Sequence, residues 1–211
     1  MKALAALWLG LTLSAAAHAG AQLEEPLADK VRGALTAAVA DTAPPRPSFD
    51  SIDDRLAYLR WLGATSEKLK KRKSEHAVRV EFLEAVWYES KRAGLEPALV
   101  LGLIQVESGF RKYAISHAGA RGYMQVMPFW SRTIGNGDAA GLFHMQTNLR
   151  FGCVILRHYL DLEQGDLFLA LGRYNGSRGR AEYPTAVFAN RRLWLGGEPA
   201  LAASRATPSG G

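Results

Sequence analysis

Helical spacing of apolar residues runs through most of this chain and restricts its fold more than any other pattern. Ile52, Leu56, Leu59 and Leu62 follow one another at intervals of four, three and three residues, which is the period of one face of an α-helix. Later segments repeat this spacing. No alternation of apolar and polar residues is long enough to predict a strand, and no internal repeat is found. The sequence therefore predicts a mainly α fold, a single compact domain of several helices.

Capping residues, prolines and glycines predict where the helices begin and end. A first helix is expected to begin behind the capping residue Ser51 and to end near Gly63. Residues 111–122 are expected to form a loop or short irregular strands. Further helices are expected from Ser74 to Gly94, over 97–107, after Pro128, from the capping residue Asn148 to Leu160, from the capping residue Asp166 to Arg173, and over 185–195.

The first residues have the pattern of a secretory signal. A short apolar run over 3–17 ends in Ala17-His18-Ala19, the small-residue pattern of a cleavage site. This run is shorter than the roughly 20 residues of a membrane-spanning helix, and no other stretch is apolar enough. Gly20 follows the cut, so no cysteine is present there to carry a lipid. We therefore expect cleavage after Ala19, a periplasmic location and no membrane span in the mature chain.

Composition divides the chain into five parts, each of which is an expectation for the structure. The prolines of DTAPPRP over 41–47 indicate an extended linker, and the end of the chain is rich in Gly, Pro, Ser and Ala. The parts are a signal peptide over 1–19, an Ala/Pro-rich segment and linker over 20–50, N-terminal helices that pack on the main domain over 51–94, the main domain over 95–195, and a disordered tail over 196–211.

The chain is basic, with a formal net charge of +6 at pH 7. In an exported protein this charge favours cell-wall carboxylates and anionic lipid as neighbours. Nucleic acid is a poor partner, because the basic cluster over 68–73 has no interleaved aromatic residues and is interpreted as a solvated helix face. The five histidines show neither an HExxH pattern nor a cluster with Cys153, the one cysteine, so we expect no metal site and no cofactor. Cys153 itself is expected to be a buried, inert thiol.

Glu107 is the unusual residue of this sequence, because it ends an expected helix over 97–107 that is apolar nearly all round. Burial and the negative end of the helix dipole both raise the pKa of a carboxyl group. A carboxyl that stays protonated near neutral pH is what a general acid requires. The alternative is a glutamate that simply turns outward at the helix end.

The residues around and after Glu107 resemble the soluble lytic transglycosylases and, more distantly, the goose-type lysozymes. The resemblance implies a lysozyme-like multi-helix fold and a peptidoglycan lytic transglycosylase, which cleaves the β-1,4 bond between N-acetylmuramic acid and N-acetylglucosamine and leaves a 1,6-anhydro-muramoyl product. The motifs that carry it are Glu107-Ser108-Gly109-Phe110, the segments AISHAGARG over 114–122 and YMQVMP over 123–128, then Asn148, Gly152, Tyr159-Leu160 and Arg173-Tyr174-Asn175-Gly176.

By this resemblance, Glu107 is the catalytic acid/base, and Tyr174 is the phenol that hydrogen-bonds and orients its carboxyl group. The matching substrate positions are Ser108, Ser116, Gln125, Met127 and Asn175, of which Met127 lines the sugar groove and Ser108 has the equal alternative of a plain helix cap. Two residues depart from the family's usual pattern, which has leucine at Tyr123 and alanine at Arg173. Both departures are expected to reshape the groove without altering the carboxylate chemistry.

Only one carboxylate lies in these motifs, whereas most glycosidases use two. The resemblance implies that an internal 6-hydroxyl of the substrate takes the place of water, and that the partners are peptidoglycan glycan strands and, as a further candidate, a secretion or conjugation apparatus. Two alternatives remain open. The first is a lysozyme-like muramidase that hydrolyses the same bond with water, and the second is an inactive glycan-binding scaffold.

Overall fold

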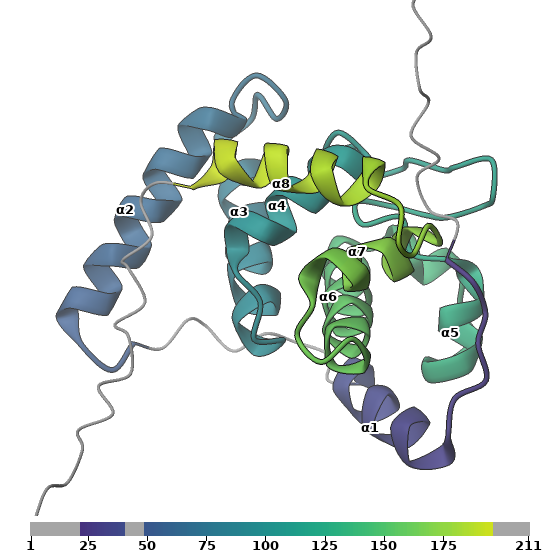
Figure 1. Cartoon of the computed structure of the whole chain (residues 1–211). Helices are drawn as coiled ribbons and strands as arrows, with labels where there is room; N and C mark the ends of the chain where they lie inside the picture. The colour runs from purple at the N-terminus through teal and green to yellow at the C-terminus, as the bar shows by residue number, and fades with distance from the viewer. Residues whose placement is uncertain (1–21, 41–48, 196–211) are drawn as a thin grey trace, which may run out of the picture.

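A computed structural model describes residues 22–40 and 49–195 of the chain. These residues form one compact, mainly α domain (Figure 1), which confirms the predicted fold class. The described part contains no strand, only isolated bridges within residues 115–126. The helices are α1 Asp29–Ala40, α2 Ile52–Leu69, α3 His76–Arg92, α4 Pro97–Glu107, α5 Pro128–Ile134, the 3₁₀ helix η1 Ala140–Phe143, α6 Met145–Leu162, α7 Leu167–Asn175 and α8 Glu182–Trp194.

The helix α4 lies in the middle of the core, as its nearly uniform apolar character requires. Every residue from Pro97 to Ile104 is buried, and α8 crosses α4 closely (Figure 1). A side chain at Gly102 would place its Cβ 2.6 Å from the backbone nitrogen of Arg191. The absence of a side chain at Gly102 therefore allows the backbones of α4 and α8 to approach each other.

The helix α2 is longer than the sequence predicted, because it continues through Gly63 to Leu69. Ser51 caps its first turn as expected, with its hydroxyl accepting a hydrogen bond from the backbone nitrogen of Asp54 at 3.0 Å. The last turns of α2 pack against α3 and bury Leu69 completely. Tertiary burial of these turns outweighs the weak helix preference of one glycine.

Two predicted caps have different outcomes. Asp166 caps α7, since its carboxylate accepts a hydrogen bond from the backbone nitrogen of Leu169 at 3.0 Å. The prediction that Asn148 caps a helix is wrong, because α6 already begins at Met145. Asn148 lies inside the first turn of α6, and its side chain binds backbone groups of other segments. Asn148 therefore pairs buried backbone groups of those segments, and not the free backbone groups at the start of α6.

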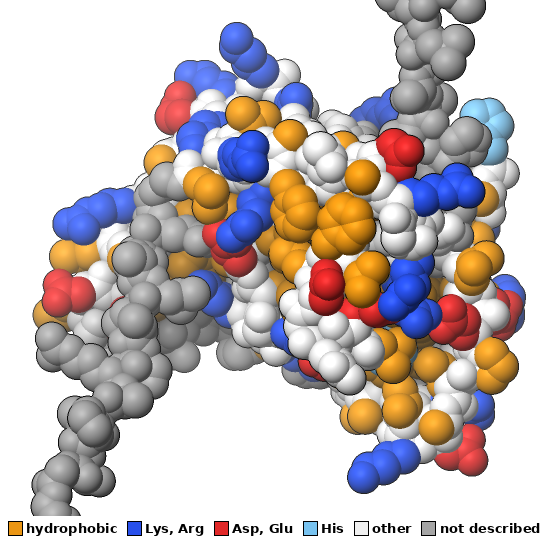
Figure 2. Space-filling model, viewed as in Figure 1, with side chains coloured by type: hydrophobic (Ala, Val, Ile, Leu, Met, Phe, Trp, Pro, Cys, Tyr) orange, Lys and Arg blue, Asp and Glu red, His pale blue; other side chains and the backbone are white. Residues whose placement is uncertain are grey.

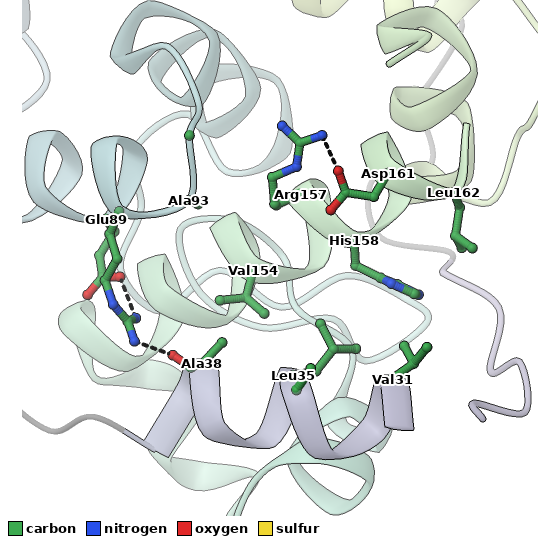
Figure 3. Close-up of a pocket in the computed structure, with 13 residues that line it drawn as sticks. Val31, Leu35, Ala38, Glu89, Ala93, Val154, Arg157, His158, Asp161 and Leu162 are labelled. Atoms are coloured by element: carbon green, nitrogen blue, oxygen red, sulfur yellow. Dashed lines mark hydrogen bonds and ion pairs between the residues drawn. The ribbon is translucent and has the colours of Figure 1, made fainter. Parts of the chain in front are cut away.

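The N-terminal helix α1 packs against α6 and α5 at one end of the domain (Figure 1). A cavity of about 680 Å³ remains between α1, α3 and α6, with Val31, Leu35 and Val154 among its apolar lining residues (Figure 3). None of the predicted site residues lines this cavity. The predicted signal peptide, the 41–47 linker and the 196–211 tail lie outside the described residues. No helix in 22–40 or 49–195 has the length and hydropathy to cross a membrane.

Candidate active site

Glu107 is the last residue of α4, and its side chain turns inward rather than outward. It is 5% exposed. Burial raises the pKa of this carboxyl group to about 8, because the charged form loses its water. At neutral pH, Glu107 is therefore mainly protonated and able to donate a proton.

The hydroxyl of Tyr183, at the start of α8, donates a hydrogen bond to Glu107 Oε1 at 2.5 Å. This bond favours the carboxylate and so opposes part of the rise in the pKa of Glu107. Among the described residues, no hydrogen-bond partner lies against the second oxygen, Oε2. Oε1 thus accepts the hydrogen bond from Tyr183, and the proton of the neutral acid is assigned to Oε2.

Tyr183 was not among the residues that the sequence singled out, and the expected hydrogen bond from Tyr174 to Glu107 is wrong. The Tyr174 hydroxyl donates instead to the backbone oxygen of Met124 at 2.7 Å. Both phenols are buried, and the nearby Glu107 carboxylate helps to raise the pKa of each well above its usual value. After the turn over 176–181, α8 brings Tyr183 to Glu107. The sequence around Tyr183 contains no pattern that predicts this contact.

Ser108 ends α4 and ties this end to the following loop. Its hydroxyl lies 2.8 Å from the backbone oxygen of Tyr123 and 3.1 Å from that of Ile104, and the side chain is buried. The helix-cap interpretation accounts for these contacts. A contact of Ser108 with substrate stays a prediction.

Asn148 organises the loop that faces the end of α4. Its Nδ2 donates to the backbone oxygens of Arg121 and Leu142, both at 2.8 Å, and its Oδ1 accepts from the backbone nitrogen of Met124 at 2.8 Å. Gly122 has a φ of 75°, and a Cβ there would lie 2.4 Å from Asn148 Nδ2. The loop can therefore wrap around the Asn148 amide only with glycine at this position.

Gln125 and Ser116 stabilise the same loop. Gln125 is buried, has a positive φ of 48°, and donates from Nε2 to the backbone oxygens of Ala114 at 3.1 Å and Gly122 at 2.9 Å. The hydroxyl of Ser116 is partly exposed and accepts a hydrogen bond from the backbone nitrogen of Ala120 at 3.1 Å. In this structure both side chains bind protein backbone, and their contacts with substrate stay predictions.

Met127 and Asn175 lie at helix ends. Met127 precedes α5 and packs, partly buried, against the core. Asn175 ends α7, where its Nδ2 donates to the Ser177 hydroxyl at 3.1 Å. Its Oδ1 is buried with no hydrogen-bond partner in the described part of the chain. Buried acceptors without a partner are uncommon in folded proteins, which keeps Asn175 among the candidate site residues.

Both departures from the family pattern make contacts with other parts of the chain. The Tyr123 hydroxyl accepts a hydrogen bond from Lys73 Nζ at 2.7 Å, and this ammonium group lies 4.6 Å from the centre of the Tyr123 ring. Burial and the charge of Lys112 lower the pKa of Lys73. The interpretation of the whole basic cluster as a solvated face is therefore wrong at Lys73. Arg173 forms ion pairs with Glu163 and Glu25.

The described residues contain no group of three or more His, Cys, Asp or Glu side chains arranged to hold a metal ion. Cys153 is buried, and burial raises the pKa of its thiol well above the usual value. Glu107 itself can donate a proton as the neutral acid and accept one as the resulting carboxylate.

The sequence of this chain is similar to a protein-family model and to several known proteins. A family model described as "Transglycosylase SLT domain" matches residues 84–188. The "Transglycosylase" of Enterobacteria phage PRD1 is 32% identical over 124 residues, which cover 56% of this chain and 45% of the phage protein. The "Membrane-bound lytic murein transglycosylase C" of Actinobacillus pleuropneumoniae serotype 5b is 38% identical over 87 residues, which cover 36% of this chain and 23% of that protein.

The chain thus matches less than half the length of these curated relatives. The solved structure of an inactive mutant of the lytic transglycosylase Slt from Pseudomonas aeruginosa is 21% identical with a TM-score of 0.48, over 67% of this chain and 29% of that one. The family match begins within α3 and contains Glu107, Tyr174 and Tyr183, but it excludes the N-terminal residues 22–40.

Proposed function

Because the chain belongs, through residues 84–188, to the family of the transglycosylase SLT domain, we propose that it is a peptidoglycan lytic transglycosylase. It cleaves the β-1,4 bond between N-acetylmuramic acid and N-acetylglucosamine and releases a 1,6-anhydro-muramoyl product. The observation that carries this proposal is the state of Glu107, which is buried, raised in pKa to about 8, and held at one oxygen only.

The reaction uses Glu107 twice. First, its Oε2 proton passes to the glycosidic oxygen, which leaves with the N-acetylglucosamine side, while the substrate's own N-acetyl group stabilises the cationic muramoyl sugar. The Glu107 carboxylate then removes the proton of the muramoyl 6-hydroxyl, and that oxygen closes on the anomeric carbon. A well-oriented internal group reaches an effective molarity on the order of 10⁵ M or higher, so the 6-hydroxyl competes with water.

The proposed residue roles follow the contacts in the structure. Glu107 is the acid/base, and Tyr183 orients its carboxyl group. Tyr174 supports the loop through the Met124 carbonyl. Ser116, Gln125, Met127 and Asn175 are kept as candidate substrate contacts. Ser108 is kept as one too, although its contacts in the structure are those of a helix cap. The buried, unpaired Asn175 Oδ1 supports Asn175 most among these.

We place the protein in the periplasm, exported by the signal over 1–19. The basic charge of the chain supports contact with the anionic cell wall, and a relative is named as a membrane-bound murein enzyme. Glycan strands are the substrate. A secretion or conjugation apparatus is the proposed partner, because such an apparatus needs a local opening in the wall.

The test is the mass of the muropeptides released from purified peptidoglycan. Wild type is expected to release 1,6-anhydro-muropeptides, whereas a muramidase adds one water to each product. The Glu107→Gln variant should remain folded by circular dichroism and lose about 10²–10⁴-fold in rate, since one residue serves both proton transfers. Hydrated products would identify the muramidase alternative, and no products from wild type would favour the inactive scaffold. Unchanged rates in folded Glu107→Gln would remove Glu107 from the mechanism.

A further inference from the structure

The turn over 70–75, between α2 and α3, contacts the loop that follows Glu107. Lys73 Nζ donates a hydrogen bond to the Tyr123 hydroxyl at 2.7 Å. The same ammonium group lies 4.6 Å from the centre of the Tyr123 ring and 5.0 Å from that of Phe82 in α3. Lys73 precedes the residues matched by the family model, whereas Tyr123 lies among them. The contact therefore joins a part of the chain outside the family match to the loop inside it.

A buried arginine fixes the backbone of this turn. The Nη1 of Arg79 donates to the backbone oxygens of Lys73 at 2.8 Å and Ser74 at 2.6 Å. Its Nε donates to the hydroxyl of Ser66, in α2, at 3.1 Å. Arg79 is 3% exposed, and hydrogen bonds from a charged donor are stronger than those between neutral groups. The backbone that carries Lys73 is therefore held in place from both α2 and α3.

The Lys73 ammonium group is partly withdrawn from water at this contact. Burial lowers its pKa, and the positive charge of Lys112 lowers it further. The Tyr123 side chain is 3% exposed, so its hydroxyl is withdrawn from water too. Loss of either partner leaves the other without its hydrogen bond in a buried place, which is unfavourable. The two side chains are therefore expected to act as one coupled pair.

The backbone of Tyr123 connects this pair to the end of α4. The backbone oxygen of Tyr123 lies 2.8 Å from the hydroxyl of Ser108, the shorter of the two contacts of that hydroxyl. Ser108 directly follows Glu107 in the sequence. The backbone of the next loop residue is held by Asn148 and Tyr174. Lys73 thus adds a hold on the side chain of the residue whose backbone is tied to α4.

We propose that Lys73 is a positioning residue, which holds the Tyr123 side chain and thereby fixes the end of α4 that carries Glu107. This inference rests on the proposed transglycosylase activity. It gives the turn between α2 and α3 a part in the reaction. It also gives a function to the tyrosine at position 123, since the leucine that is usual in the family has no acceptor for an ammonium group.

The test compares variants of the full chain. Lys73→Met keeps an unbranched side chain but removes the ammonium group, and Tyr123→Phe keeps the ring but removes the acceptor. Lys71→Met is the matched control, because Lys71 is exposed in the same turn and the substitution removes the same charge. The readouts are kcat and KM for release of anhydro-muropeptides, the free energy of unfolding in urea, and the backbone amide signals of Ser108 and Gly109 in NMR spectra.

Lys73→Met is expected to lose about tenfold in kcat, the effect of one well-placed hydrogen bond. Its KM should change little, because Ser116 and Gln125 keep their own backbone contacts. The amide signal of Ser108 should move. Lys73→Arg keeps a donor and should recover part of the lost kcat, whereas Lys71→Met should match wild type in kcat and in the amide signals.

A double variant tests whether the two side chains act through one contact. Tyr123→Phe should lose kcat to about the same extent as Lys73→Met. The variant with both substitutions should be no slower than the slower single variant, whereas two independent losses would multiply to about 100-fold. Contacts that serve stability alone would lower the free energy of unfolding in these variants and leave kcat of the folded protein unchanged, and that result would overturn the proposal.

Equal losses of kcat in Lys73→Met and Lys71→Met would also overturn it, because the charge of the turn rather than the contact would then be responsible. If Lys73→Met does not fold, Tyr123→Phe decides, and wild-type kcat in that variant would overturn the proposal. The failure of the proposed function is distinguishable. In that case wild type releases no anhydro products, whereas the Ser108 amide signal still reports whether Lys73 fixes the end of α4, and an unmoved signal in Lys73→Met would overturn this inference.

Discussion

Two opposing effects on Glu107 determine how this residue behaves. Burial disfavours its charged form, and the hydrogen bond from Tyr183 favours it. Burial is the larger effect, so the pKa is raised from 4.5 to about 8. The carboxyl group can thus begin as an acid at neutral pH and, after giving up its proton, be stabilised as a base by Tyr183.

A raised pKa in the folded state makes stability depend on pH. Because folded Glu107 holds its proton up to about pH 8 and the unfolded chain releases it near 4.5, the favourable contribution is fully present below about pH 4.5 and is lost as pH rises to 8. Glu107→Gln has no ionisable group at this position, so the stability of this variant does not fall in this way as pH rises. We expect the variant to be more stable than wild type by on the order of 1–4 kcal/mol at pH 8–9, with little difference at pH 4.

Urea unfolding at pH 4, 6 and 8.5 measures this difference. Glu24→Gln is the control, because Glu24 is exposed. A change at Gln105 is unsuitable as a control, because Gln105 accepts a hydrogen bond from the Trp194 indole. An equal effect of Glu107→Gln at all three pH values would show that the pKa of Glu107 is not raised in the folded protein.

The two buried tyrosines near Glu107 are expected to respond differently to loss of their hydroxyl groups. Tyr183→Phe removes the hydrogen bond to Glu107 Oε1, so the pKa of Glu107 should rise, the alkaline limit of activity should move to higher pH, and kcat should fall roughly 10–100-fold. Tyr174→Phe removes the bond to the Met124 carbonyl and should destabilise the protein by about 1–2 kcal/mol, with a smaller effect on kcat. Initial rates across pH and thermal unfolding of both variants test this contrast. A larger loss of kcat in Tyr174→Phe would return the orienting role to that residue.

At the level of secondary-structure elements, the loop after α4 has little regular structure and depends on α6 for its shape. Asn148 supplies three hydrogen bonds from the first turn of α6 to this loop and to η1. Loop residues carry the predicted substrate contacts Ser116, Gln125 and Met127. The position of one helix therefore determines the geometry of the loop opposite Glu107.

Replacement of Asn148 by alanine is expected to leave buried backbone groups unpaired. The Asn148→Ala variant should lose about 2–4 kcal/mol of stability and, where still folded, should have a raised KM because the loop is displaced. Thr147→Ala is the control in the same helical turn. Urea unfolding and Michaelis–Menten analysis check the two effects, and equal stability of the two variants would contradict the organising role of Asn148.

Across the whole molecule, the turn between α2 and α3 brings basic groups to the loop that follows Glu107. Arg72 lies 5.5 Å from the centre of the Phe110 ring, and Lys73 binds Tyr123. Figure 2 shows Lys and Arg side chains at the surface over α2 and the turn to α3. With an overall charge of +6, the protein presents an attractive surface to anionic cell wall.

Attraction of this kind is weakened by salt, since the screening length falls from about 10 Å at 0.1 M to about 3 Å at 1 M. We expect the fraction of protein that sediments with purified walls to fall several-fold as sodium chloride is raised from 0.05 to 0.5 M. Glu107→Gln is the form to use, because it is expected to digest the walls at least about 100-fold more slowly than wild type during the assay. Binding that is constant over this range would show that contacts other than charge hold the protein on the wall.

The periodicity of apolar residues, with the prolines, glycines and caps, was sufficient to predict the mainly α fold and the helix over 97–107. It singled out Glu107 at the end of that helix but left open whether its side chain turns inward or outward. These features depend on residues close together in the sequence, and a carboxyl group at the end of an apolar helix is visible there directly. The caps at Ser51 and Asp166 were predictable for the same reason, because a cap binds backbone two or three residues away.

Only the tertiary structure decided which side chains meet. Glu107 binds Tyr183 rather than Tyr174, Asn148 serves a loop rather than a helix end, and Gln22 reaches Trp130 across 108 positions of sequence. Each of these contacts depends on how helices cross and on which buried polar atom needs a partner, and neither is encoded in a local pattern. Local patterns therefore singled out Glu107, whereas the packing of α8 against α4 determined that Tyr183 holds its carboxyl group.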